Sequence, residues 1–279
     1  MKHFTAPDGA RIAYRDTGSG RPLVLLHGLM AHSGFFRSQA ALAADFRLIS
    51  IDLRGHGESR SGGAAPTVEA LAGDVGALAD RLELEDAVGL GWSLGAAVMW
   101  LVLTGPQGPR FAGSVIVDMS PRVLNGGDWQ LGLSREACDA RSEAIAGDFE
   151  SFAVNAGQAI FAQPVAAERK DDAAWASREF ARNDAATMGM LWSSLMGEDF
   201  RPLLGRIRQP ALIVHGAQSQ LYGVETAAQL AAALPDARAI AFQRSGHAPH
   251  IEEPALFNQV ITDFAAGLPQ VRTVQTARN

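Results

Sequence analysis

A serine lies between two glycines in the segment Gly91-Trp92-Ser93-Leu94-Gly95, a pattern that is typical of a nucleophile turn. The apolar run Ala87 to Leu90 precedes this segment, and the helix-like run Ala96 to Leu103 follows it. A sharp turn from a strand into a helix leaves no room for side chains beside the serine, which explains the glycines. The turn would hold the hydroxyl at the carboxyl end of the strand, next to helix amides that favour negative charge. We therefore predict that Ser93 is a nucleophile in acyl transfer.

The elements that would position this serine alternate between short apolar runs and helical patterns. Such alternation predicts a mostly parallel sheet with helices on both faces. Helical spacing is clearest from Thr67 to Leu82, where apolar residues recur every three or four positions. A turn signal at Asp8-Gly9, before Arg11 to Tyr14, predicts that the sheet begins with antiparallel strands. The other predicted strands are Leu23 to Leu26, Leu48 to Ile51, Ala87 to Leu90, Ser114 to Val117, Ala211 to Val214 and Ala239 to Phe242.

The regular alternation is interrupted after Asp118. Helix-like sequence follows, which predicts a helical cap at 121–205 inserted into an α/β core formed by 1–120 and 206–279. Large aromatic residues recur in the predicted cap. Because aromatic residues at helical spacing usually belong to a core, only a minority should line a substrate pocket. They include Trp129, Phe149, Phe152, Phe161, Trp175, Phe180 and Trp192.

The length and composition exclude several classes of protein. With 279 residues and 47% hydrophobic content, the chain is long enough to bury a sizeable core. The formal net charge is −6, and the 24 Lys and Arg residues are scattered, which argues against a nucleic-acid partner. No run approaches the ~20 apolar residues of a membrane helix, and the start, Met1 to Asp8, lacks the apolar core of a signal peptide. We expect a soluble, cytoplasmic protein without a membrane partner, with a loosely held tail after Leu268.

The single cysteine, Cys138, cannot form an internal disulfide, which fits a reducing compartment. No histidine lies near it in a recognisable motif, so a small buried apolar residue is the preferred interpretation over a nucleophile. No cluster of histidines or carboxylates has the spacing of metal ligands, and no glycine-rich segment suits a dinucleotide. We therefore expect neither a metal nor a cofactor. The oligomeric state is left open.

Four blocks of sequence occur in an order that is typical of one known family. His27-Gly28 follows the first apolar run, and Asp52-Leu53-Arg54-Gly55-His56-Gly57-Glu58-Ser59 follows the next. The serine turn is third, and Ser245-Gly246-His247-Ala248-Pro249-His250 is fourth. Over nearly its whole length the chain thereby resembles the α/β-hydrolase family, in particular its small capped esterases and haloperoxidase-like members. The resemblance implies the α/β-hydrolase fold and a serine hydrolase that cleaves a carboxylic ester, or a similarly activated small acyl compound, through an acyl-enzyme without a cofactor.

The resemblance also implies roles for particular residues. The substrate oxyanion would be held by the backbone amides of Leu94, directly after the nucleophile, and of Leu29, in the loop after the first parallel strand. The family's chain order of nucleophile, acid and histidine makes His247 the general base. The competing histidine is His250, three residues later, which we expect to be a loop or surface residue.

Structural roles are expected for several other histidines and for the charged loop that contains Asp52 and Arg54. Three histidines precede a glycine at a strand end or in a loop, where hydrogen bonds usually shape the turn: His27, His56 and His215. We expect His32 to be a solvated loop residue.

The acid of the triad departs from the commoner family pattern. After the run Ala211 to Val214 the family usually has a glycine, two residues and then an aspartate, whereas this chain has Gly216-Ala217-Gln218-Ser219. The family's second solution places the acid at the end of the preceding strand, where Asp118 stands. We predict Asp118 as the acid. Three alternatives remain open: a loop-capping role for Asp118, Glu225 as the acid, and a Ser93–His247 dyad without an acid.

A serine rather than an aspartate at position 93 argues against haloalkane dehalogenase or epoxide hydrolase chemistry, which in this fold uses a carboxylate nucleophile. Lactone opening, C–C bond hydrolysis and perhydrolysis use the same constellation, so fold-level analogy does not choose among them. A ligand receptor that retains the triad but turns over slowly is a rival from another class.

Overall fold

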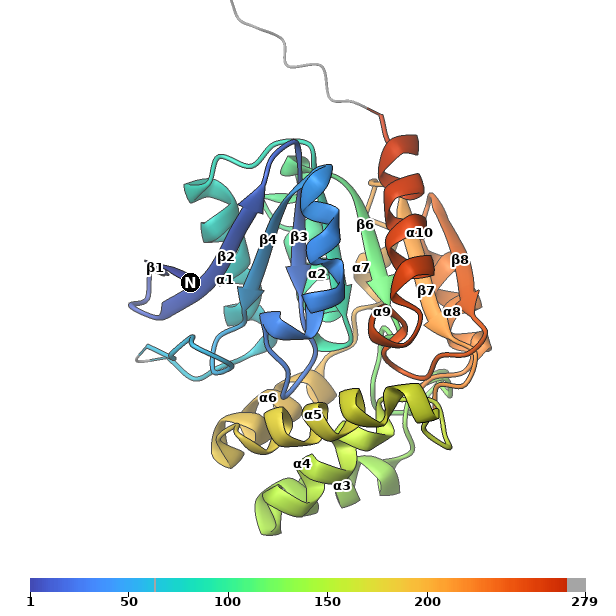
Figure 1. Ribbon diagram of the computed structural model, residues 1–279. Coiled ribbons are helices and arrows are strands. Elements are labelled where there is room, and N and C mark those ends of the chain that lie inside the picture. The colour runs from blue at the N-terminus through green and yellow to red at the C-terminus, as the bar shows by residue number, and fades with distance from the viewer. Residues whose placement is uncertain (63, 270–279) are drawn as a thin grey trace, which may run out of the picture.

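The predicted sheet is present in the computed structural model, which describes residues 1–62 and 64–269 (Figure 1). Its strand order is β1-β2-β4-β3-β5-β6-β7-β8. The β1/β2 and β2/β4 pairs are antiparallel and the remaining pairs are parallel, which confirms the predicted antiparallel start of a mostly parallel sheet. The strands are β1 (Lys2–Thr5), β2 (Arg11–Gly18), β3 (Arg21–Leu26), β4 (Phe46–Asp52), β5 (Ala87–Trp92), β6 (Phe111–Val117), β7 (Ala211–Gly216) and β8 (Ala237–Phe242).

Helices cover both faces of this sheet, with η1 and α10 on one face and α1 and α2 on the other (Figure 1). The central strands are therefore buried on both sides, which explains why the sequence shows continuous apolar runs there instead of alternation. None of the helices in the described residues is both long and apolar enough to cross a membrane. The helices packed on the sheet or at its edges are η1 (Ser33–Ala44), α1 (Val68–Arg81), α2 (Leu94–Thr104), η2 (Gly108–Arg110), α8 (Val224–Ala233), α9 (Pro249–Glu252) and α10 (Pro254–Gly267).

The helix α1 shows how closely the local pattern determines an element. Its N-terminal cap is Thr67, whose side chain accepts a 3.2 Å hydrogen bond from Ala70 N and so satisfies a free amide of the first turn. The apolar stripe predicted from the spacing, which includes Leu71 and Leu78, is buried. The helix ends at Arg81, one residue before the predicted end.

The chain between β6 and β7 is helical. We call residues 121–205 the cap segment. Figure 1 shows α3 to α6 gathered beyond the carboxyl ends of the parallel strands, where they face the turn that contains Ser93. The end of the chain that was expected to be loosely held, 270–279, lies outside the described residues. The helices of the cap segment are α3 (Arg135–Gly147), α4 (Phe149–Ala159), η3 (Ala167–Arg169), α5 (Lys170–Ala181), α6 (Ala185–Gly197) and α7 (Arg201–Leu204).

Candidate active site

Ser93 occupies the sharp turn between β5 and α2. Its φ of 53° and ψ of −119° are a strained combination for a residue with a side chain. The flanking glycines allow close backbone approach: a Cβ at Gly91 would lie 2.3 Å from Gly95 O, and one at Gly95 would lie 2.2 Å from Leu26 O. The Ser93 amide donates a 2.9 Å hydrogen bond to Val117 O, which ties the turn to β6. The serine hydroxyl is thereby held at the carboxyl edge of the sheet.

Asp118 and His247, far apart in the chain, meet at this edge. Asp118 directly follows β6 with a φ of 46°, and its amide donates a 2.8 Å hydrogen bond to Val214 O. The Nδ1 atom of His247 lies 2.5 Å from Asp118 Oδ2, and both side chains are buried. A carboxylate at Nδ1 orients an imidazole and fixes its tautomer, which leaves Nε2 as the free nitrogen. The structure thus brings Asp118 to the predicted base.

The position that carries aspartate in the commoner pattern also faces this pair. Ser219 Oγ donates a 2.7 Å hydrogen bond to Asp118 Oδ2, the same oxygen that contacts His247. The other oxygen, Asp118 Oδ1, has no hydrogen-bond partner in the described part of the chain. The alternative acid, Glu225, is exposed in the first turn of α8. The geometry therefore favours Asp118 over Glu225 as the partner of His247.

The amides predicted to hold the oxyanion belong to Leu94 and Leu29. Leu94 is the first residue of α2, so its N–H belongs to the first turn, whose amides have no acceptor within the helix. Leu29 lies in the loop after β3 and lines the same pocket as Ser93. Within residues 1–62 and 64–269, neither amide donates a hydrogen bond to another residue. Both N–H groups are therefore without an acceptor among the described residues.

Two buried histidines shape the loops around the site, as predicted. His27 Nε2 accepts a 2.9 Å hydrogen bond from Leu53 N, and His56 Nε2 accepts one of 3.2 Å from Met30 N, beside Leu29. Burial lowers the pKa of both imidazoles, to about 4 for His56, so both remain neutral acceptors. The same expectation was wrong for His215, because no described group bonds either of its buried ring nitrogens.

Two further expectations about histidines were wrong. His250 is not a loop or surface residue: it is fully buried in α9, with its ring centroid 5.2 Å from that of Phe36 and 4.7 Å from that of Trp92. Burial lowers the pKa of His250 to about 3, so the ring is neutral. His32 is half-buried rather than solvated; it caps η1, and its Nε2 lies 3.2 Å from Glu179 Oε2 on α5.

The charged loop after β4 has the predicted structural role. Asp52 accepts hydrogen bonds from two backbone amides at 2.8 and 2.9 Å. The Arg54 side chain is 2% exposed and bonds both oxygens of Asp74, through Nε at 2.8 Å and Nη2 at 2.7 Å. It also bonds Asp8, through Nη1 at 2.5 Å and Nη2 at 3.0 Å. These contacts tie the loop to η1, to α1 and to the turn between β1 and β2.

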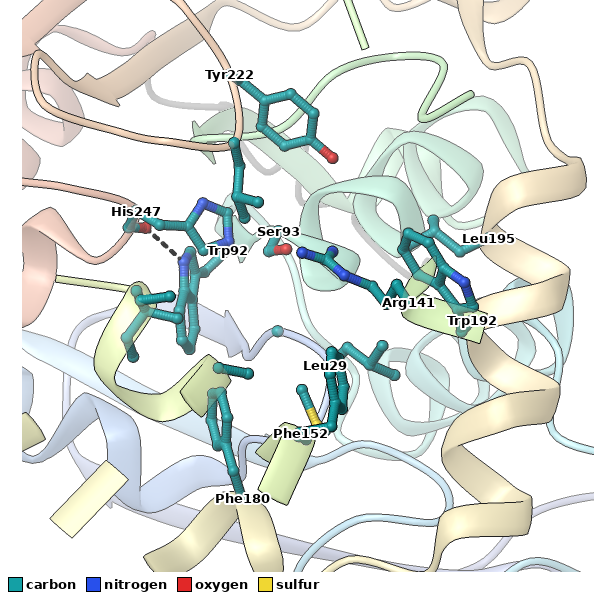
Figure 2. A pocket seen from close by; sticks show the side chains of 16 residues that line it. Leu29, Trp92, Ser93, Arg141, Phe152, Phe180, Trp192, Leu195, Tyr222 and His247 are labelled. Carbon is teal, nitrogen blue, oxygen red and sulfur yellow. Dashed lines mark hydrogen bonds between the residues drawn. The ribbon is translucent and has the colours of Figure 1, made fainter. Parts of the chain in front are cut away.

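A pocket lies beside Ser93 and His247, between the strand ends and the cap segment (Figure 2). Its walls are mostly apolar. Trp92 Nε1 donates a 2.8 Å hydrogen bond to His247 O, the dashed line in Figure 2, which holds the histidine loop against the serine turn. A minority of the aromatic residues of the cap segment line the pocket, as predicted: Phe152, Phe180 and Trp192.

Two polar side chains on the pocket wall were missed by the sequence analysis: Arg141 on α3 and Tyr222 in the loop after β7. Both point into the pocket in Figure 2. Nothing in the local sequence distinguishes Arg141 from Arg135 on the same helix. Only the docking of α3 over the strand ends brings Arg141 next to Ser93.

A third missed residue, Glu252, connects the cap segment to the histidine loop. Its Oε1 accepts a 2.7 Å hydrogen bond from Ala162 N in the cap segment. Its Oε2 accepts one of the same length from Gly246 N, next to His247. Burial raises the pKa of Glu252 to about 7. This carboxyl group is thus a buried link between the two walls of the pocket.

The groups that face the pocket are suited to proton transfer and nucleophilic attack. They comprise a serine hydroxyl, an imidazole, a guanidinium group, a phenol and backbone amides. In the part of the chain described, no group of three or more His, Cys, Asp or Glu side chains is arranged to hold a metal ion.

Comparisons with known proteins agree with this fold. Residues 23–260 match the Alpha/beta hydrolase family, and the chain belongs to this family. The Pimeloyl-[acyl-carrier protein] methyl ester esterase of Nitrosomonas europaea is 30% identical over 254 residues, which cover 89% of this chain and 97% of that protein. The esterase RhEst1 from Rhodococcus sp. ECU1013 is 28% identical with a TM-score of 0.82, covering 96% of this chain and 99% of its own.

The fold has a further close match in the esterase EaEST from Exiguobacterium antarcticum. Its TM-score is 0.89 at 24% identity, and the alignment covers 95% of this chain and 99% of that structure. The predicted α/β-hydrolase fold and the resemblance to its esterases are thus confirmed. The chain is a member of a hydrolase family that includes esterases.

Proposed function

We propose that this protein is a serine hydrolase that cleaves a carboxylic ester through an acyl-enzyme. The observation that carries the proposal is the alignment of three groups at one sheet edge. Ser93 stands in a strained turn, His247 lies beside it on the pocket wall, and Asp118 bonds the far nitrogen of that histidine. A nucleophile, a base and a group that orients the base are the requirements of this chemistry.

In the first step, His247 Nε2 accepts the Ser93 hydroxyl proton while Ser93 Oγ bonds the ester carbonyl carbon. The carbonyl oxygen becomes an oxyanion, which the free amides of Leu29 and Leu94 stabilise. Collapse of this intermediate breaks the bond to the alkoxide, and that alkoxide takes the proton from His247. The acyl group remains on Ser93.

In the second step, a water molecule gives a proton to His247 and attacks the acyl carbon. The second intermediate collapses, the acid product leaves, and the proton returns to Ser93 Oγ. Asp118 stabilises the imidazolium formed in each step, because its carboxylate lies directly against Nδ1. No cofactor is used in this sequence of steps.

The test is steady turnover of short-chain p-nitrophenyl esters by the wild type and by Ser93→Ala. Removal of the nucleophile from a serine protease costs about 10⁶-fold in kcat, and we expect a loss of that order here. Cys138→Ala is the control. Cys138 is fully buried, as predicted, and burial raises the pKa of its thiol, so its loss should leave turnover unchanged.

Two outcomes would contradict the proposal. Activity of Ser93→Ala within about tenfold of wild type would remove Ser93 as the nucleophile. Stoichiometric labelling of Ser93 by a phosphonate without turnover of any ester would indicate a ligand receptor that retains the triad. Including lactones and dienoates in the same panel tests lactone and C–C bond hydrolysis, which use the same residues.

A further inference from the structure

Arg141 brings a positive charge into a pocket whose other walls are largely apolar. It belongs to α3, and Figure 2 shows its guanidinium group pointing toward Ser93. The Arg141 side chain is half-buried, and this partial burial lowers the pKa of its guanidinium group. A guanidinium group nevertheless remains protonated in proteins at physiological pH.

No carboxylate compensates this charge within the described residues. Arg141 takes part in no ion pair and no hydrogen bond there, and no Asp or Glu lines the pocket. The guanidinium group makes a cation–π contact with Trp192, whose ring centroid lies 5.0 Å from the Arg141 Cζ atom. Arg135, two turns earlier on α3, is 65% exposed and lies 3.8 Å from Asp139. Of the two arginines on this helix, Arg141 is therefore the half-buried one without a carboxylate partner among the described residues.

The groups around Arg141 hold it in place and add a second donor. Trp192, under the guanidinium group, is fixed by a 3.0 Å hydrogen bond from its Nε1 to Ser142 Oγ. The Tyr222 hydroxyl points into the same pocket and has no hydrogen bond to any described residue (Figure 2). Burial raises the pKa of Tyr222, and the positive charge of Arg141 nearby opposes that rise. The phenol thus stays protonated and is able to donate.

A cation that is partly removed from water and lacks a partner is less well stabilised than a solvated one, and a ligand that supplies the missing anion offsets this cost. The planar fork of N–H donors on a guanidinium group matches the two oxygens of a carboxylate. The apolar side chains around it, such as Phe152, Ile160 and Leu195, suit a short hydrocarbon spacer. The pocket therefore combines an anion site with an apolar wall beside the nucleophile.

We propose that Arg141, with Tyr222, binds a free carboxylate of the substrate, so that the preferred substrates are small esters that carry a carboxylate. This inference rests on the proposed function and names the substrate class of the same site. The carboxylate belongs to the acyl part in half-esters of dicarboxylic acids and to the alcohol part in acyl esters of hydroxy acids. Either connection presents the same anion to Arg141.

The experiment compares kcat/KM for charged esters with kcat/KM for neutral esters of the same shape. Monoethyl succinate and its terminal amide test a carboxylate on the acyl side. Acetoxyacetate and acetoxyacetamide test one on the alcohol side. A charge-assisted hydrogen bond contributes about 1.5–3 kcal/mol, so we expect the wild type to prefer the charged member of at least one pair by about 10- to 100-fold.

Variants of α3 assign that preference to Arg141. In Arg141→Met the ratio of charged to neutral kcat/KM should fall by at least about tenfold, mainly through a higher KM for the charged ester. Arg141→Lys should restore part of the ratio, since it retains the charge but not the bidentate fork. Arg135→Met removes an arginine from the same helix outside the pocket and should keep the wild-type ratio.

Binding without turnover separates this inference from the proposed function. Monoethyl succinate should bind the Ser93→Ala variant and change the fluorescence of Trp92 and Trp192, which line the pocket. Arg141→Met in that background should weaken binding by about tenfold or more. If the wild type turns over neutral esters through Ser93 without preferring charged ones, the carboxylate site is wrong and the proposed function stands. Equal losses on charged and neutral esters in Arg141→Met would also overturn the site.

Discussion

Two arginines, the buried Arg54 and the half-buried Arg141, lie in different regions of the molecule and have opposite surroundings. Arg54, in the loop after β4, is 2% exposed and bonds both Asp74 and Asp8. Arg141, on α3 in the cap segment, has no carboxylate partner among the described residues and faces the pocket. Hydrogen bonding to Asp74 raises the pKa of Arg54, whereas burial lowers that of Arg141. Both residues are arginines removed at least partly from water, but among the described residues only Arg54 has its charge neutralised by carboxylates.

The difference between the surroundings of Arg54 and Arg141 indicates the role of each positive charge. A buried cation with two well-placed carboxylates is part of the structure, because removing either side leaves the other unpaired in a poorly solvated place. A half-buried cation without a partner is not explained by stability, since hydrophobic replacements are often more stable. The same reasoning applies to anions: Asp118 is paired with His247, and Glu252 is held only by backbone amides.

The largest effect is expected where a paired charge also takes part in the chemistry. Asp118→Asn keeps the shape of the side chain but presents no negative charge to His247. We expect kcat to fall by at least about 10²-fold and by up to ~10⁴-fold, with little change in KM, because substrate binding does not use the acid. Steady-state kinetics with a neutral ester measure both constants. Near wild-type kcat would reduce Asp118 to a loop cap.

The neighbouring Ser219 sharpens this test. Its hydroxyl lies 2.7 Å from Asp118 Oδ2, but Asp118 keeps its contact with His247 when this hydroxyl is removed, so Ser219→Ala should lower kcat by less than about tenfold. In the double variant Asp118→Asn with Ser219→Asp, a carboxylate returns next to the same imidazole nitrogen. Partial recovery of kcat relative to Asp118→Asn would show that both positions reach His247.

Arg54→Met should affect stability rather than specificity. It leaves Asp74 buried without a counter-charge, and breaking such a buried pair costs about 3–5 kcal/mol in the free energy of unfolding. Arg141→Met leaves no unpaired partner and should cost less than about 1 kcal/mol. Urea unfolding of the two variants measures both values. Equal losses would mean that the two arginines do not differ in the way their surroundings indicate.

A double variant provides the control for Arg54. Replacing Asp74 by Leu together with Arg54→Met removes both charges of the buried pair, and we expect part of the lost stability to return. The ratio of charged to neutral ester turnover should be the same in Arg54→Met as in the wild type, because Arg54 does not line the pocket.

The same contrast explains which features could be predicted from the sequence. Each predicted parallel strand lies within an observed one, and the central strands were evident because a strand buried on both faces is a continuous apolar run. The three predicted catalytic residues follow strand ends: Ser93, Asp118 and His247. Because the sheet is rigid, the order of its strands determines where the residues after each strand lie. The absence of an aspartate at Ser219 pointed to Asp118, and the structure places Asp118 against His247.

The features that were missed depend on how separate elements dock. Arg141 resembles other arginines of the cap segment in sequence, and only the packing of α3 over the strand ends decides that it enters the pocket. His250 was wrongly expected at the surface, because its segment is too short to show a helical period. Pro249 begins the single turn α9, which packs against η1 and buries the imidazole beside Phe36.

Glu252 lies at the junction of the two regions, and its effect should appear as a pH dependence of stability. Burial raises its folded-state pKa from 4.5 to about 7, so between these values the folded protein binds more protons than the unfolded chain. The stabilisation linked to this proton is fully present below about pH 4.5 and is lost as the pH rises through about 7. A shift of this size corresponds to about 3 kcal/mol at most.

The Glu252→Gln variant removes this titration. The amide resembles the protonated carboxyl group, since each has one carbonyl oxygen that accepts from the N–H groups of Ala162 or Gly246. The free energy of unfolding of the variant should therefore rise relative to that of the wild type by up to about 3 kcal/mol as the pH rises from 4.5 to 7, because only the wild type loses stability through this group. Urea unfolding at several pH values measures the difference between the two curves.

Cys138→Ala should keep the wild-type slope, since burial raises the pKa of that thiol above its usual value and it does not titrate in this range. Parallel curves for wild type and Glu252→Gln would show that the carboxyl group is already ionised across the range, and that the two backbone amides outweigh its burial.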